Sequence, residues 1–132
     1  MIGFLYRASD ALRRRSYRAN HGRIGEDLAH RYLRAAGCTV VARNYRPPSG
    51  HGEIDIVVWH QGKLVFAEVK TRAGADFGEP ESAVDLEKRR NVMRAARDYA
   101  RRANVAWDDV RFDIVSVVLA PQRIEWLRDA FH

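Results

Sequence analysis

Two runs of β-branched and aliphatic residues constrain the fold of this chain most. They are Ile-Asp-Ile-Val-Val-Trp at 54–59 and Ile-Val-Ser-Val-Val-Leu at 114–119. A strand with one solvated face alternates apolar and polar residues, and neither run does so. Both are therefore expected to be strands that are covered on both faces. The runs predict an α/β protein, a sandwich with helices on either side of a mixed sheet.

Helical and strand patterns follow one another in the order helix, three strands, helix, two strands. The predicted helices cover residues 25–36 and 81–103, and the predicted strands cover 38–45, 53–59, 63–69, 110–119 and 123–127. A glycine-containing loop is expected at 72–80. Residues 1–20 are expected to form a basic helical appendage, and residues 21–132 a single domain.

Composition limits the classes of protein that this chain can belong to. Its 132 residues are 46% hydrophobic, enough for the core of one domain. A net charge of +6 and a pI near 10.0 suit a nucleic-acid partner, an anionic surface or a basic soluble enzyme. The single Cys38 excludes an internal disulfide. No apolar run has the roughly 18 residues of a membrane helix, so we expect a cytoplasmic protein without a membrane partner.

Acidic residues and a lysine recur at every second position of two predicted strands. Glu53 and Asp55 lie two apart on one strand, and Glu68 and Lys70 lie two apart on the next. Side chains two apart in a strand project to the same face. The link at 60–62 contains a glycine suited to a tight hairpin. We therefore expect the two faces to lie side by side and to bring the acids and the lysine together.

Crowded carboxylates in an apolar sheet are unfavourable unless a cation joins them. A salt bridge from Lys70 is one solution. A bound Mg²⁺ is the other, because Mg²⁺ takes oxygen ligands from carboxylates, water and substrate phosphates. The spacing of Asp55 and Glu68 favours a magnesium-dependent nuclease site, in which Lys70 orients or deprotonates the attacking water, or stabilises developing charge. The Val69 carbonyl is a further candidate ligand. Glu26 either stabilises the start of the first helix or completes the metal shell.

Five short motifs are distributed over residues 20–132. They are Gly22-x-x-Gly25-Glu26, Gly52-Glu53-Ile54-Asp55, Phe66-Ala67-Glu68-Val69-Lys70-Thr71-Arg72, Arg111-Phe112-Asp113 and Ala130-Phe131. Together they resemble the YraN family, a bacterial group of largely uncharacterised proteins. That family in turn resembles the PD-(D/E)XK nuclease superfamily, especially archaeal Holliday-junction resolvases.

The resemblance implies a restriction-endonuclease-like α/β/α sandwich around a mixed five-stranded sheet, so that residues 21–132 form a single nuclease-like domain. It implies three catalytic residues, which are Asp55, Glu68 and Lys70. It implies a Mg²⁺ or Mn²⁺ cofactor with four ligands, which are Glu26, Asp55, Glu68 and Val69. Glu53 belongs to the family motif and is expected to support the metal ligands without binding the ion.

The implied function is a metal-dependent endonuclease that hydrolyses phosphodiester bonds in DNA, including branched or structured DNA. The competing hypothesis is a non-catalytic nucleic-acid-binding or adaptor protein that retains the nuclease fold. A homodimer is a further hypothesis, because the appendage at residues 1–20 can join two copies in the manner of resolvase dimers.

A basic stripe is expected on the second helix. Arg90, Arg94, Arg97 and Arg101 recur at spacings of four, three and four residues. Such a stripe either follows a phosphate backbone or is a solvated helix face. The residues with the strongest prediction of nucleic-acid contact lie nearer the acids. They are Lys88, Arg89 and Arg72.

Overall fold

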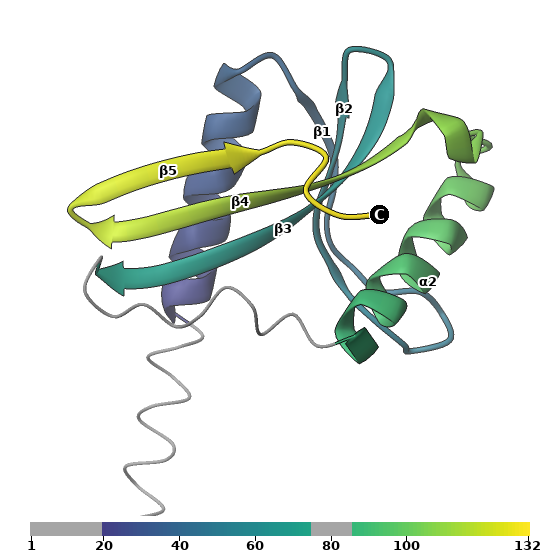
Figure 1. The fold of residues 1–132 in the computed structure, drawn as a ribbon, viewed down its shortest axis with the longest axis horizontal. Coiled ribbons are helices and arrows are strands. Elements are labelled where there is room, and N and C mark those ends of the chain that lie inside the picture. The colour runs from purple at the N-terminus through teal and green to yellow at the C-terminus, as the bar shows by residue number, and fades with distance from the viewer. Residues whose placement is uncertain (1–19, 75–85) are drawn as a thin grey trace, which may run out of the picture.

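A mixed sheet of five strands forms the centre of the molecule (Figure 1). The computed structural model describes residues 20–74 and 86–132. The strands are adjacent in sheet order and are β1 (Thr39–Tyr45), β2 (Ile54–His60), β3 (Lys63–Gly74), β4 (Val110–Ala120) and β5 (Gln122–Leu127). Strands β3 and β4 are parallel, and every other neighbouring pair is antiparallel. The predicted mixed five-stranded sheet is confirmed.

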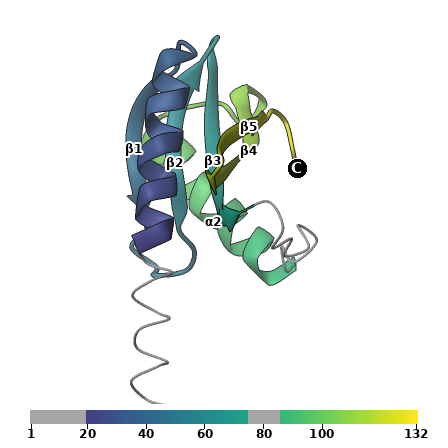
Figure 2. The same cartoon turned by 90° about the vertical axis from the view of Figure 1, so that its left-hand side faces the viewer.

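One helix covers each face of this sheet (Figure 2). The first helix is described over residues 20–35. Its Leu33 packs against one face of the sheet, in a cluster with Ile56 and Val58 of β2. Helix α2 (Leu86–Arg102) packs its alanines and Val92 against the other face, around Phe66. This α/β/α arrangement is consistent with the restriction-endonuclease-like fold. No helix in the two described ranges is long and apolar enough to cross a membrane.

Strand β3 is longer than predicted. It continues to Gly74, because the parallel pairing with β4 extends to the pair Gly74 and Ala120. The prediction of a loop at residues 72–80 was therefore wrong for 72–74. The rest of that loop, the predicted helical residues up to 85 and residues 1–19 of the predicted appendage lie outside the described residues.

The hairpin between β2 and β3 fixes the position of the acidic residues. Gln61 and Gly62 both have positive φ, +50° and +79°, as a two-residue type I′ turn requires. Pairing starts at His60 with Lys63 and ends at Ile56 with Ala67. In this register Asp55 and Glu68 come just after the last pair of the ladder.

Candidate active site

The paired residues of β2 and β3 end at Ile56 and Ala67, and beyond them the side chain of Asp55 hydrogen-bonds the backbone of β3. Asp55 Oδ2 accepts a hydrogen bond of 2.8 Å from the backbone N–H of Val69. The same carboxyl group is hydrogen-bonded to Glu68. Two carboxyl groups that share a hydrogen bond need a proton between them. In the absence of another cation, the two acids therefore hold less than two full negative charges.

Burial and mutual repulsion perturb both acids. Glu68 is only 8% exposed, and burial raises its pKa to about 9, with the negative charge of Asp55 as the second cause. Burial also raises the pKa of Asp55, while the Val69 N–H opposes that rise. Within the described residues, Glu68 Oε1 is buried without a hydrogen-bond partner. A buried acceptor of this kind is costly unless a donor or a cation completes it.

Lys70 and the backbone of Val69 lie beside this acid pair. Glu68 and Lys70 line one small hollow together, as their shared strand face predicts. The side chain of Val69 packs into the core on the opposite face. Its N–H points toward β2, and the carbonyl of a strand residue points to the same side as its N–H. The Val69 carbonyl is therefore directed to the side on which Asp55 lies.

A larger open hollow lies in front of the two acids. It has a volume of about 390 Å³ and is lined by Gly52, Glu53, Asp55, Glu68, Glu87, Lys88, Asn91 and Val92. Among the described residues, Lys88 is the cation that acts most strongly on both acids, and it lowers the pKa of each. Sequence reasoning placed Lys88 only as a DNA contact. Its position opposite the acids follows from the packing of α2 on the sheet.

Asn44 connects Glu53, which lines this hollow, to Glu26 of the first helix. With its amide nitrogen turned toward the acids, Asn44 donates to Glu26 Oε2 at 3.2 Å and to Glu53 Oε1 at 3.1 Å. Arg43 Nη2 also lies 3.7 Å from Glu26 Oε2. Burial, followed by the charge of Asp55, raises the pKa of Glu26. Sequence reasoning missed Asn44, whose only local signal is its place at a strand end before a loop.

Glu53 lies at the start of the strand that carries Asp55. Strand β2 begins at Ile54, one residue later than predicted, so Glu53 lies just before it. Its carboxylate forms an ion pair of 3.1 Å with Arg46, while it still lines the hollow with Asp55. Glu53 thus supports the rim of the hollow rather than joining the central acid pair.

The donor set suits a hard cation, although it is not a preformed cage. Residues 20–74 and 86–132 contain no group of three acidic, histidine or cysteine side chains placed to hold one ion. Asp55 and Glu68 are together, and Glu26 has Arg43 and Asn44 as its own partners. Two carboxylates, a nearby carbonyl and open space for water are the environment in which Mg²⁺ is usually bound. The unpaired Glu68 Oε1 is the atom that such an ion would complete.

The basic residues of α2 and β3 are divided between the hollow beside the acids and other parts of the surface. Arg89 lines the hollow of Glu68 and Lys70, with its guanidinium 6.0 Å from the ring of Phe131. Arg72 lines a separate hollow of about 250 Å³ with Ser116 and Arg123. The predicted arginine stripe of α2 is exposed. Two of its members already have partners, because Arg97 stacks on Trp107 and Arg101 pairs with Asp98.

Gly52 sets the distance between α2 and the strand that carries Asp55. Its φ is +89°, and a Cβ atom there would collide with the backbone carbonyl of Asn91. Gly50 has a similar φ of +77° but open space around it. Gly52→Ala is expected to lose about 3 kcal/mol of stability from strain plus collision, and Gly50→Ala about 1 kcal/mol from strain alone. Urea unfolding of both variants measures this, and equal losses would contradict the proposed contact.

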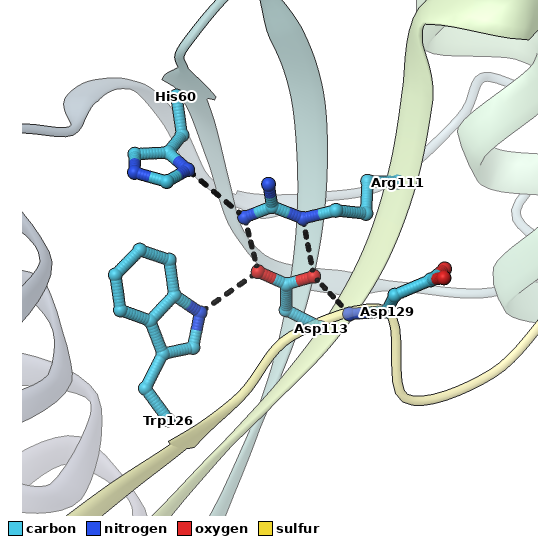
Figure 3. A network of polar contacts seen from close by, with 5 residues as sticks. All are labelled: His60, Arg111, Asp113, Trp126 and Asp129. Carbon is cyan, nitrogen blue, oxygen red and sulfur yellow. Dashed lines mark hydrogen bonds and ion pairs between the residues drawn. The ribbon is translucent and has the colours of Figure 1, made fainter.

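A second buried acid, Asp113, serves the fold (Figure 3). Its side chain is fully buried and accepts hydrogen bonds from Arg111 at 2.9 and 2.8 Å. The indole of Trp126 donates at 2.8 Å and the backbone of Asp129 at 2.9 Å. Arg111 also contacts Nδ1 of the buried His60 at 3.2 Å. With every lone pair engaged, Asp113 has no capacity for a metal ion.

The fold and the acid pair together define a class, an α/β/α sandwich with paired carboxylates and a lysine at the centre of its sheet. Residues 25–117 match the Uncharacterised protein family UPF0102. A UPF0102 protein of Solibacter usitatus is 70% identical over 132 residues, which cover 99% of this chain and 100% of the relative. A UPF0102 protein of Rhodococcus opacus is 43% identical over 113 residues, with coverage of 83% and 94%. One of Desulfosudis oleivorans is 40% identical over 114 residues, with coverage of 86% and 91%.

The chain belongs to the UPF0102 family. This membership confirms the YraN-like family that the five motifs indicated.

Proposed function

We propose that this protein is a metal-dependent endonuclease that hydrolyses phosphodiester bonds in DNA, with branched or structured DNA among its candidate substrates. The observation that carries this proposal is the pair Asp55 and Glu68. These acids share a hydrogen bond inside the sheet, and among residues 20–74 and 86–132 one oxygen of Glu68 is buried without a hydrogen-bond partner. A structural role gives no reason to hold two repelling carboxylates at this position.

The proposed cofactor is Mg²⁺ or Mn²⁺, held by Asp55, Glu68 and the carbonyl of Val69. Glu26, which contacts Arg43 and Asn44 and is influenced by the charge of Asp55, is proposed as a further ligand. When bound, the cation lowers the pKa of a coordinated water and neutralises charge on the phosphate.

The side chains of the protein then have distinct tasks. The Val69 N–H fixes the orientation of the Asp55 carboxylate. Lys70, in the same hollow as Glu68, orients the attacking water and stabilises negative charge on the phosphate as a P–O bond forms to water and a P–O ester bond breaks. Lys88 and Arg89 line the hollows beside the acids, and Arg72 lies farther along β3. These three cations are proposed to contact backbone phosphates.

Cleavage of a DNA panel tests this function. The panel contains single strands, duplex, flaps and four-way junctions, each with Mg²⁺, Mn²⁺ or EDTA. Asp55→Ala, Glu68→Ala and Lys70→Met are each expected to reduce cleavage by about 100-fold or more. Asp109→Asn removes an exposed carboxylate from the far end of the sheet, where it pairs with Lys63, and should cleave normally.

Two outcomes would overturn the proposal. Equal cleavage by the parent and the Glu68→Ala protein would mean that the activity is a contaminant. Salt-dependent DNA binding without cleavage under any metal condition would establish the non-catalytic binding protein instead.

A further inference from the structure

Lys88 has a position that sequence reasoning did not foresee. It lines the open hollow in front of Asp55 and Glu68, and it also lines the smaller hollow that contains Glu68 and Lys70. Lys88 therefore lies between the two hollows, and Glu68 borders both. Helix α2 has three other basic residues up to Arg94, which are Arg89, Arg90 and Arg94. Of these, only Arg89 lines one of the two hollows, the smaller one.

The packing of α2 fixes this position. The backbone of Asn91 lies against Gly52, in a contact so close that it leaves no room for a side chain. Asn91 is one helical turn after Lys88, and Gly52 is three residues before Asp55. The turn of α2 that carries Lys88 is thus tied to the segment that carries Asp55. Val92, in the next position, is buried in the core and holds the helix against the sheet.

The charge of Lys88 favours the ionised form of both acids. A cation near two carboxylates stabilises them, and it also repels a second cation that approaches the same oxygens. Lys88 is an exposed residue. Its long, flexible side chain can therefore move into solvent at little cost when another cation arrives.

We propose that Lys88 is a displaceable counter-ion of the Asp55 and Glu68 pair, and that it competes with a divalent cation for these two carboxylates. This inference rests on the proposed metal site, and it adds a residue that sets the affinity of that site for a divalent cation. Lys88 acts through the acids and is in this respect a positioning residue. In the metal-free protein it stabilises the acid pair, and on metal binding its ammonium group leaves the carboxylates.

A Mn²⁺ titration of the full chain without DNA tests the competition. Lys88→Gln is expected to bind Mn²⁺ about three- to fivefold more tightly than the parent protein at low ionic strength, because the competing charge is gone. Salt of about 0.5 M should reduce this difference, since the ammonium is exposed. Lys88→Arg keeps the charge and should bind Mn²⁺ as the parent does. Arg90→Gln removes an exposed charge from the same helix, outside both hollows, and should also leave the affinity unchanged.

Thermal unfolding without metal provides an independent readout. Lys88→Gln is expected to lower the melting temperature by about 2 to 4 °C, and this loss should disappear in a background in which Asp55 and Glu68 are changed to Asn and Gln. Simple damage to the helix would lower both stability and Mn²⁺ affinity, whereas loss of a counter-ion lowers the first and raises the second.

The outcomes separate this inference from the proposed function. If the parent binds Mn²⁺ and Lys88→Gln binds it equally or more weakly, the counter-ion role is overturned and the metal site stands. If Mn²⁺ binds to none of the proteins, the metal site itself is overturned, and the competition with it.

Discussion

Glu68→Gln is expected to make the metal-free protein more stable at pH 8, although it removes a residue proposed for catalysis. The pKa of Glu68 is about 9 in the folded protein, against an ordinary value of 4.5. The folded protein therefore binds one more proton than the unfolded chain between these values, and its stability falls as the pH rises through that range. Glutamine is uncharged at every pH and reproduces the shape of the protonated acid. The variant should gain about 2 kcal/mol at pH 8, or roughly 5 to 10 °C in melting temperature, and almost nothing below pH 4.5.

The measurement is urea unfolding of both proteins from pH 4.5 to pH 9 in the presence of EDTA. Glu125→Gln is the matched control, because Glu125 is exposed and pairs with Arg123 on the edge strand β5. Its stability should change with pH as that of the parent does. Saturating Mn²⁺ should stabilise the parent more than Glu68→Gln. A Glu68→Gln protein that is less stable than the parent at pH 8 would show that the ionised Glu68 side chain stabilises the fold.

Asp113→Asn is expected to have the opposite effect, a loss of about 3 to 5 kcal/mol. The Asp113 side chain is fully buried, and that of Arg111 is 16% exposed. Removal of one partner leaves the other charge desolvated and unpaired, which costs far more than the intact pair contributes. The asparagine also loses part of the capacity to accept from Trp126 and from the Asp129 backbone. The urea midpoint should fall sharply while the slope of the transition stays the same.

The chain contains a matched ion pair as a control for this effect. Arg123 and Glu125 are also two residues apart on one strand, with the same N to O distance of 2.8 Å. Their side chains are 71% and 53% exposed, so water screens the pair. Glu125→Gln should cost less than about 1 kcal/mol. If Asp113→Asn cost no more than this, the buried network would be unimportant for stability.

Local periodicity in the sequence predicted most of the fold. The apolar runs of β2 and β4 predicted strands covered on both faces, and these strands lie between the first helix and α2. The glycine in the link between β2 and β3 predicted a tight hairpin. The turn has two residues, Gln61 and Gly62, instead of the predicted three, because His60 still pairs with Lys63. That turn fixes the register in which Asp55 and Glu68 lie opposite each other.

The predictions that differ depend on contacts between distant segments. Strand β3 continues to Gly74 only because β4 is long enough to pair with it. Strand β2 begins at Ile54 rather than at Glu53, and the Glu53 side chain pairs with Arg46, which follows the end of β1. Neither contact has a signature in the residues next to it in the chain.

The sequence by itself determined the order of the elements, the α/β class and the two acids, because periodicity, turn geometry and strand alternation act over a few residues. The tertiary structure decided the electrostatics of the site. It buried Glu68 beside Asp55, gave Glu26 the partners Arg43 and Asn44, and placed Lys88 of α2 opposite the acids. The physical reason is that burial and Coulomb interactions depend on distance in space, and segments far apart in the chain are brought together only when the core packs.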